Sequence, residues 1–425
     1  MPLTDVLERL YARRRFGIRP GVDRVGTLLM RLGNPEKQFR TIHVAGTNGK
    51  GSTSAFLSSI LLHAGHPVAQ FSSPHLVRFT ERFRINGSEY SAEKLAAKLD
   101  TVLDAAPEEA TFFEITTALA AYVFSEERVE LAVMEAGMGG RSDATAAFNG
   151  EMTLLAPIAL DHTDYLGATL ADIAREKAGI IKPGTHVISA EQPGAVRPAI
   201  EEQCRSGCSV LRMLGTDFSV DVHLNGAFDY HGMNRSLTQL ISGLAGRYQF
   251  GNAAVALAAA EVLDAGGVRI TDSALVDGIA AASWPGRMEL VPGMPPLLLD
   301  GAHNPAGAAA LAEALQEYSW SRLLLVTGVC SDKDIDQIYA PLLPLVDAVF
   351  TVTPAVERAL SDEQLAHFFN RQGRASEPCG SVAAGISKAR TQASEGDLIL
   401  VCGSLFVVGE AKAWLEQVNF TGIRG

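Results

Sequence analysis

Short apolar runs rich in β-branched residues alternate with longer helical patterns along most of this chain. Parallel strands need long crossover connections, usually helices, so this alternation predicts an α/β fold built on a mostly parallel sheet. The first series of predicted strands is IHVAG (42–46), VAQFSS (68–73), LAVMEAG (131–137), TLLAPIAL (153–160) and THVISA (185–190). Between 212 and 248, polar and apolar residues alternate between glycines, which predicts a β-meander.

A second strand and helix series follows WPGRMELVPGMPP at 284–296. A chain of 425 residues is long for one hydrophobic core, and stretches rich in proline and glycine often connect domains. We therefore predict two domains, 1–288 and 289–425, with the boundary inside 286–296. The expected elements of the second are PLLLDG (296–301), a helix from Pro305, RLLLVTGV (322–329), VDAVFTVTP (346–354) and DLILVCGSLF (397–406).

Charge and composition exclude several classes of function. The 36 basic and 48 acidic residues give a net charge of −12, so no basic field exists to attract nucleic acid. The N-terminus lacks the apolar core of a signal peptide, and Glu261 interrupts the most apolar later stretch. Five scattered cysteines suit a reducing compartment. We expect a cytoplasmic protein without membrane contact and, since no helix face demands a partner, a monomer.

The segment IHVAGTNGKGST at 42–53 has the context of a phosphate-binding loop, because a glycine turn joins a predicted strand to a helix. Converging backbone N–H groups and the helix N-terminus attract phosphate, Lys50 adds a positive charge, and Ser52 or Thr53 is a candidate for reaching Mg²⁺. Val44 replaces the first glycine of the GxxxxGK[ST] pattern and Gly51 interrupts its end. These departures disfavour a generic kinase or GTPase loop. A plain glycine turn with a solvated lysine is the simpler alternative.

Acidic and imidazole side chains follow two predicted strands. Glu135 ends the strand before a glycine-rich turn that contains Asp143, and Asp161 and His162 follow TLLAPIAL. Strand ends of a parallel sheet point into one ligand crevice, where a carboxylate and an imidazole can share Mg²⁺ with phosphates. Lys177 lies in a helical pattern and, from spacing alone, is expected to be a surface charge.

An ordered series of motifs covers nearly the whole chain: GTNGKGS, SSPHLVRFTERFRING, TFFEITT, MEAGMGGRSDAT, LDHTDYLG, REKAGIIKPG, QFGNAAVALAAA, WPGRME, LDGAHNP and SDKD. In this order they resemble the bifunctional dihydrofolate synthase/folylpolyglutamate synthase family of Mur-type ligases. The resemblance implies an ATP-binding central α/β domain and a smaller Rossmann-like C-terminal domain that closes over the active site.

The resemblance also implies functional residues. For ATP they are Thr47, Asn48, Gly49, Lys50, Gly51, Ser52, Asn252, Arg287, Asp300 and His303. Mg²⁺ is expected on Ser73, Glu135 and His162, and Lys177 corresponds to a lysine that is commonly carbamylated. The implied pterin-binding residues are Arg19, Pro20, Gly21, Thr111, Phe112, Phe113, Glu114, Ser142, Asp143 and Ala144. Lys50, His162 and Lys177 are the expected catalytic residues.

The implied reaction is ATP-dependent addition of L-glutamate to 7,8-dihydropteroate, and of further glutamates to reduced folates, through an acyl phosphate. Asp143 and TFFE favour both activities over a folylpolyglutamate synthase alone. GKGS in place of GKT, together with DATAAF, argues against a Mur ligase that extends peptidoglycan precursors. A P-loop kinase or motor ATPase is a remote alternative. A silent nucleotide-binding module is disfavoured, because Lys50, Glu135, His162 and Lys177 are all present.

Overall fold

The computed structural model describes residues 2–13, 21–418 and 420. Its first lobe, residues 2–288, is built on a large sheet. The strands are β1 Arg40–Ala45, β2 Val68–Phe71, β3 Phe83–Ile85, β4 Ser88–Glu89, β5 Leu131–Glu135, β6 Gly150–Leu155, β7 His186–Ser189 and β8 Val210–Met213. Their order is β4-β3-β2-β5-β1-β6-β7-β8. Six neighbouring strands are parallel: β2, β5, β1, β6, β7 and β8. The strands β3 and β4 form an antiparallel edge next to β2.

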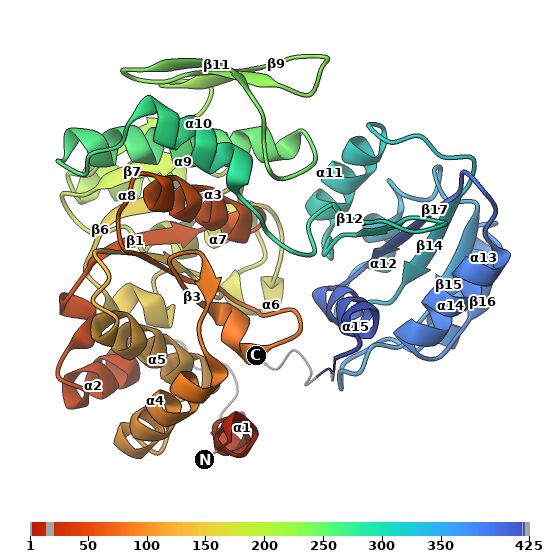
Figure 1. The fold of residues 1–425 in the computed structure, drawn as a ribbon, viewed down its shortest axis with the longest axis horizontal. Coiled ribbons are helices and arrows are strands. Elements are labelled where there is room, and N and C mark those ends of the chain that lie inside the picture. Colours follow the sequence, from red (N-terminus) through yellow and green to blue (C-terminus); the bar gives the residue numbers. More distant parts are fainter. Residues whose placement is uncertain (1, 14–20, 419, 421–425) are drawn as a thin grey trace.

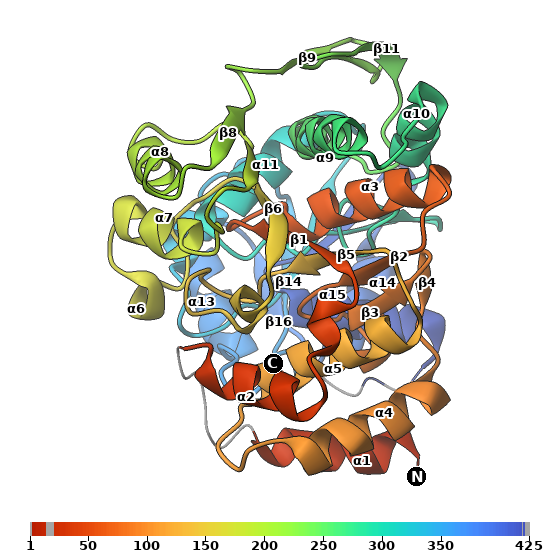
Figure 2. The same cartoon turned by 90° about the vertical axis from the view of Figure 1, so that its left-hand side faces the viewer.

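Helices cover both faces of this sheet (Figure 2). They are α1 Leu3–Tyr11, α2 Asp23–Arg31, α3 Lys50–His63, α4 Ala92–Ala105, α5 Phe112–Glu126, α6 Thr163–Leu166, α7 Leu170–Ala178, α8 Arg197–Ser206, α9 Tyr248–Ala265 and α10 Asp272–Ala281. Successive side chains of a strand point to opposite faces. Leu131 and Val133 of β5 therefore join the core formed with α3 and α9, whereas Ala132 and Met134 join the core formed with α4 and α5.

A three-stranded antiparallel sheet confirms the predicted meander. It contains β9 Ser219–Val222, β10 Phe228–His231 and β11 Ser236–Leu240, in the order β11-β10-β9. This sheet lies beyond α9 and α10 at the top of Figure 1. Phe228 of β10 stacks on Phe250 of α9 with ring centroids 4.8 Å apart, which anchors the meander to the first lobe.

The second lobe, residues 289–420, contains its own six-stranded sheet and lies beside the first (Figure 1). Its strands are β12 Glu289–Val291, β13 Leu297–Leu299, β14 Leu323–Thr327, β15 Ala348–Thr351, β16 Ser376–Pro378 and β17 Leu398–Cys402. Its helices are α11 Pro305–Leu315, α12 Ile335–Tyr339, α13 Asp362–Arg371, α14 Val382–Gln392 and α15 Leu405–Glu416. The order β12-β13-β17-β14-β15-β16 is parallel except for β12.

The α/β fold class, the strands of both series and the helix from Pro305 are confirmed. Several strands end before the predicted runs do, and the early end of β6 bears on the site. β6 ends at Leu155, and the chain then leaves the sheet through Pro157, which has no N–H group to donate to a ladder. His162 therefore follows an irregular connection rather than the strand itself. The division into domains 1–288 and 289–425 stays a prediction.

Two further observations bear on function. No helix among the described residues is long and apolar enough to cross a membrane.

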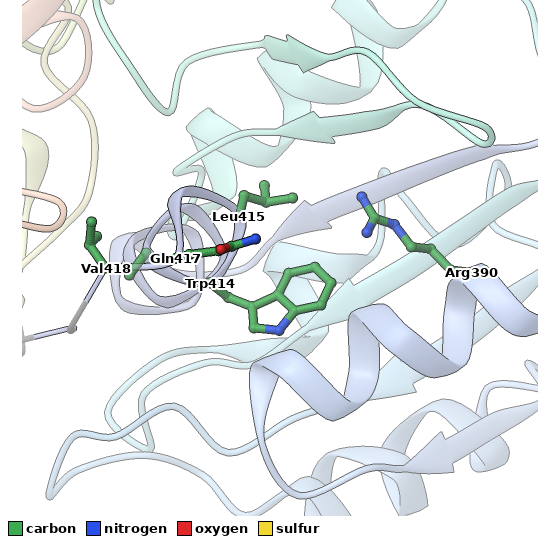
Figure 3. Close-up of a pocket in the computed structure, with 6 residues that line it drawn as sticks. Arg390, Trp414, Leu415, Gln417 and Val418 are labelled. Atoms are coloured by element: carbon green, nitrogen blue, oxygen red, sulfur yellow. The ribbon is translucent and has the colours of Figure 1, made fainter.

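A pocket of about 460 Å³ opens beside α14 and α15 and is lined by Arg390, Ala413, Trp414, Leu415, Gln417 and Val418 (Figure 3). None of these residues carries a predicted role, so this pocket is separate from the candidate site.

Candidate active site

The phosphate-binding loop connects β1 to α3. Its Gly49 has φ +86°, and a Cβ atom there would lie 2.4 Å from Oδ1 of Asn252. A side chain is therefore excluded by both backbone conformation and space. This close approach brings buried Asn252, on α9, against the loop. The predicted ATP residues 47–52 and Asn252 are thus gathered at the N-terminus of α3, where the helix dipole favours phosphate.

Hydrogen bonds hold this loop to the connection after β6. The backbone N–H groups of Thr47 and Asn48 donate to the oxygen of Pro157 at 2.9 and 3.2 Å. The Thr47 hydroxyl donates to the oxygen of Ala159 and accepts from its N–H, both at 3.1 Å. Lys50 Nζ donates to the oxygen of Thr47 at 3.2 Å. Lys50 stays half-buried, whereas Ser52 and Thr53 are buried.

Glu135 is the last residue of β5 and is buried. Its Oε2 accepts a long bond of 3.4 Å from the backbone N–H of Ser73. Burial raises the pKa of Glu135 to about 7, although Lys50 opposes this shift. A further cation beside this carboxylate would favour its charged form.

His162 precedes α6 and has a left-handed backbone, with φ +50°. Burial lowers the pKa of His162 to about 4, despite the opposing charge of Asp161. The imidazole is therefore neutral at pH 7, which is the form that coordinates metals.

The predicted metal residues have donor atoms suited to a Mg²⁺ ion that is shared with phosphates. Among the described residues, no group of three or more His, Cys, Asp or Glu side chains could hold a metal. Mg²⁺ bound with phosphates keeps several waters and needs only one or two carboxylates. Buried Glu135, neutral His162 and the Ser73 hydroxyl match that requirement, and an added cation would offset the buried charge of Glu135.

Lys177 is not the surface charge that helix spacing predicted. It is only 4% exposed, and its Nζ donates to the oxygen of Gly46 at 2.8 Å. Burial lowers the pKa of Lys177 to about 7, and the positive charge of Lys50 adds to this effect. Lys177 is buried because α7 packs under the phosphate loop, a tertiary contact that residue spacing does not show. A Cβ on Gly140 would lie 2.3 Å from the oxygen of Lys177, so the glycine-rich turn sits directly against this helix end.

Asp143 organises the glycine-rich turn. Its Oδ2 accepts from the N–H groups of Gly137 and Met138 at 2.9 and 3.0 Å. Its Oδ1 accepts from the N–H and hydroxyl of Thr145 at 2.9 and 2.6 Å. Burial raises the pKa of Asp143, whereas these four bonds oppose that shift. The carboxylate therefore fixes the conformation of its own loop.

The other predicted pterin residues adjoin this turn. Thr111 and Glu114 form a capping box at the start of α5, and Arg24 pairs with Glu114 at 2.8 Å. The ring of Phe113 packs so closely on Gly137 that a Cβ there would lie 2.5 Å away. Residues Phe112 and Ala144 are buried, Ser142 is half-buried, and Ser142 accepts a 3.3 Å bond from the N–H of Gly21. Arg19 and Pro20 lie outside the described residues.

The second lobe supplies Asp300 and His303, whereas Arg287, the third remaining predicted ATP residue, lies at the end of the first lobe. Asp300 follows β13 and accepts from the N–H groups of Met288 and Ala302, both at 2.9 Å. Burial raises the pKa of Asp300, and Arg287 is the largest opposing influence. The ring of His303 contacts the oxygen of Gly301 through Nδ1 at 2.8 Å, which makes Nδ1 the donor.

Two asparagines join the lobes at the phosphate loop. Asn48 Nδ2 donates to Asn304 Oδ1 at 3.1 Å, and Asn304 Nδ2 donates to Asn48 Oδ1 at 2.9 Å. The Asn304 side chain also caps α11 by accepting from the N–H of Gly307. The connections that follow β1 and β13 are therefore in direct contact at the phosphate loop.

Family models match most of the chain: the Mur ligase middle domain over residues 44–260 and the Mur ligase glutamate ligase domain over 286–405. The dihydrofolate synthase/folylpolyglutamate synthase of Bacillus subtilis is 34% identical over 97% of this chain and 99% of its own length. The chain belongs to this family. Its members are ATP-dependent ligases, which agrees with the expected enzyme class.

Solved structures of family members agree in fold. E. coli FolC in complex with DHPP and ADP has a TM-score of 0.91 and 33% identity, covering 98% of both chains. A bifunctional folylpolyglutamate synthase/dihydrofolate synthase with Mn, AMPPNP and L-glutamate bound has a TM-score of 0.88 and 32% identity, again covering 98% of both. A divalent metal and small-molecule substrates therefore belong to the chemistry of this family.

One relative is longer. The probable bifunctional folylpolyglutamate synthase/dihydropteroate synthase of Halobacterium salinarum is 36% identical over 96% of this chain, which spans only 51% of that relative. The likeness to it therefore concerns about half of that protein.

Three interlobe residues of this synthase-family chain have no predicted role: Asp161, Asn304 and Lys333. Asn304 and Lys333 lie in the motifs LDGAHNP and SDKD, and Asp161 is one of several carboxylates predicted to follow a strand. The structure gathers all three, with Lys333 Nζ 2.7 Å from Asp161 Oδ1. The sequence signal that could have identified Asn304 and Lys333 is their position, because each follows a predicted strand of the second series.

Proposed function

We propose that this chain joins L-glutamate to 7,8-dihydropteroate, and adds further glutamates to reduced folates, while ATP is converted to ADP and phosphate. The observation that carries the proposal is the contact between the phosphate loop of one lobe and Asn304 of the other. A nucleotide bound at this loop would be enclosed between the two lobes. A ligase requires such enclosure, because water would hydrolyse its activated intermediate. The family relationship supports the substrates.

Phosphoryl transfer is the first chemical step of the proposal. A carboxylate resists attack by an amine, so the terminal phosphoryl group of ATP is transferred to a carboxylate oxygen, giving an acyl phosphate and ADP. Lys50 stabilises the charge on the transferred group. Thr47 to Ser52 bind the phosphates, and Asn252, Arg287, Asp300 and His303 hold the rest of the nucleotide. Ser73, Glu135 and His162 would hold Mg²⁺, which neutralises phosphate charge when bound.

Amide formation is the second step. The free amine of glutamate attacks the carbonyl carbon of the acyl phosphate, and the tetrahedral intermediate expels inorganic phosphate. Residues of both lobes hold the reactants in line and exclude water. The pterin is held by Thr111 to Glu114, Ser142 to Ala144 and Gly21. Arg19 and Pro20, which lie outside the described residues, are proposed to bind it as well. In this proposal Asp143 shapes the pterin loop through its four internal hydrogen bonds.

Carbamylation of Lys177 is a further part of the proposal. With a pKa of about 7, much of the amine is uncharged at neutral pH. An uncharged amine attacks CO₂, forming an N–C bond and releasing one proton. The resulting carbamate is anionic and relieves the repulsion between Lys177 and Lys50. Incubation with ¹³C-bicarbonate should give a carbamate carbon signal that Lys177→Arg lacks; the same signal in both proteins rejects this site.

We also propose that the working unit is one cytoplasmic chain of two domains, 1–288 and 289–425, because every proposed site residue comes from a single copy. Light scattering after size exclusion tests the monomer. A stable dimer that dissociates only with loss of activity would reject it.

The experiment that tests the function is ADP release by purified protein with L-glutamate and Mg²⁺, supplied with dihydropteroate, tetrahydrofolate or neither. The proposal is supported if ADP is released with each pterin and if both pterins give glutamylated products. Product from tetrahydrofolate alone would instead establish a single-activity folylpolyglutamate synthase. Inactivity with both pterins, but turnover of a nucleotide-linked muramyl peptide, would establish a peptidoglycan-precursor ligase.

A further inference from the structure

A cluster of polar and charged side chains joins the lobes next to the phosphate loop. Asp161 comes from the first lobe, and three partners come from the second. Lys333 Nζ lies 2.7 Å from Oδ1 of Asp161, Asn304 Nδ2 lies 3.2 Å from Oδ2, and His303 Nε2 lies 3.5 Å from Oδ2.

This ion pair is largely shielded from water. The side chain of Asp161 is 8% exposed and that of Lys333 is 13% exposed. Ion pairs on open surface contribute little, whereas removing one partner of a buried pair leaves an uncompensated charge. The second carboxylate near Lys333, that of Asp332, is farther away at 3.8 Å and more exposed. Asp161 is therefore the principal anion for Lys333.

Asp161 also belongs to the connection that supports the phosphate loop of its own lobe. Its Oδ1 accepts from the backbone N–H of His162 at 2.9 Å, at a residue held in the left-handed region. The same connection carries Pro157 and Ala159, which receive the hydrogen bonds of the phosphate loop. A shift of Asp161 would therefore move His162 and the support of the loop together.

We propose that Lys333 is a positioning residue for phosphoryl transfer. Its ion pair with Asp161 links the approach of the second lobe to the placement of the phosphate loop and His162. Lys333 does not touch the reacting atoms in this account. The proposal rests on the proposed function and goes beyond it, because it assigns a role to a lysine that lies outside the sets of nucleotide, metal and pterin residues.

The test compares Lys333→Met, Lys333→Arg and Asp161→Asn with wild type, and uses Lys388→Met as a matched control. Lys388 belongs to the same lobe and pairs with Glu377, but it is 43% exposed and remote from the first lobe. Steady-state kcat and KM are measured for each substrate, and ADP affinity is measured by calorimetry. Thermal unfolding verifies that each variant is folded.

A misplaced reacting group can lower a rate by up to about a hundredfold, so we expect Lys333→Met to lower kcat about ten- to a hundredfold. ADP affinity and the KM for glutamate should change by less than about twofold, because Lys333 acts on placement rather than on binding. Lys333→Arg should recover most of kcat, and Lys388→Met should match wild type.

A double variant keeps the proposal falsifiable if a single charge left alone destabilises the protein. Lys333→Met combined with Asp161→Asn removes both charges, and its kcat should be no lower than that of the worse single variant. Multiplied losses, an unchanged kcat in Lys333→Met, or a loss confined to the KM for glutamate would each overturn the proposal. An inactive wild type would instead reject the proposed function itself.

Discussion

Lys177 Nζ donates a 2.8 Å hydrogen bond to the main-chain oxygen of Gly46, which ties the end of α7 to the first residue after β1. A buried ammonium thus supports the start of the phosphate loop. Its charge is opposed by burial and by Lys50, so its protonation and the stability of the loop are linked.

This linkage predicts a pH dependence of stability. The unfolded lysine keeps its proton up to a pKa of 10.5, whereas the folded one loses it near pH 7. Between these values the unfolded state binds more protons, so the free energy of unfolding rises with pH. Below pH 7 Lys177 is protonated in both the folded and the unfolded state, so the destabilisation caused by its buried charge is present in full. Denaturant unfolding in CO₂-free buffer should show this rise in wild type and a smaller one in Lys177→Met; equal slopes contradict the pKa assignment.

Glu135→Gln should have opposite effects with and without metal. The raised pKa of Glu135 means that burial disfavours its charged form, so an amide should leave the metal-free protein at least as stable. The same change should abolish most of the rise in Tm that Mn²⁺ and a nucleotide analogue give the wild type. Glu130→Gln, an exposed change directly before β5, is the control. A Tm rise equal to that of wild type would remove Glu135 from the metal site.

Lys50→Ala should separate catalysis from folding. The half-buried side chain makes one hydrogen bond, to the oxygen of Thr47, so its loss should change the unfolding free energy by about 0.5 kcal/mol or less. Loss of charge stabilisation at the transferred phosphoryl group should lower kcat at least about a hundredfold. Exposed Lys37→Ala should behave as wild type. Retained turnover in Lys50→Ala would show that the loop is not catalytic.

Asp143→Ala should affect the two pterin substrates unequally. It leaves the N–H groups of Gly137, Met138 and Thr145 without their acceptor, at about 1–3 kcal/mol for each group that stays unsatisfied. Dihydropteroate lacks the glutamate that gives a folate additional contacts, so disorder of this loop should harm its use more than that of tetrahydrofolate. Relative kcat/KM values measure this, with exposed Asp164→Ala as control. Equal losses contradict a pterin role for the loop.

The sequence was sufficient to predict the main parallel strands, because burial on both faces of a parallel strand leaves a readable apolar run. It did not predict β3, β4, β8, β12 and β16, which lie at or next to the edges of the two large sheets. The sequence was also sufficient to predict the phosphate loop. A positive φ and the close contact with Asn252 require glycine at position 49 of this loop. Both signals are local.

Tertiary packing explains what could not be predicted from residue spacing. Lys177 has the spacing of a surface residue, and only the packing of α7 beneath the loop buries it. Lys333 and Asp161 are 172 residues apart, so their contact exists only once the lobes meet. The resemblance pointed to Lys177 but assigned nothing to Lys333. A motif can thus identify a position whose physical role only the fold reveals.

The most direct test of the central claim follows oxygen from the pterin carboxylate. Dihydropteroate labelled with ¹⁸O in its carboxylate is incubated with ATP, Mg²⁺, L-glutamate and the purified protein, and the products are analysed by mass spectrometry. Glutamylated pterin together with inorganic phosphate that carries one ¹⁸O atom is the predicted result, because the acyl phosphate passes a carboxylate oxygen to phosphate. Unlabelled phosphate, or no glutamylated product while ATP is consumed, would contradict the account.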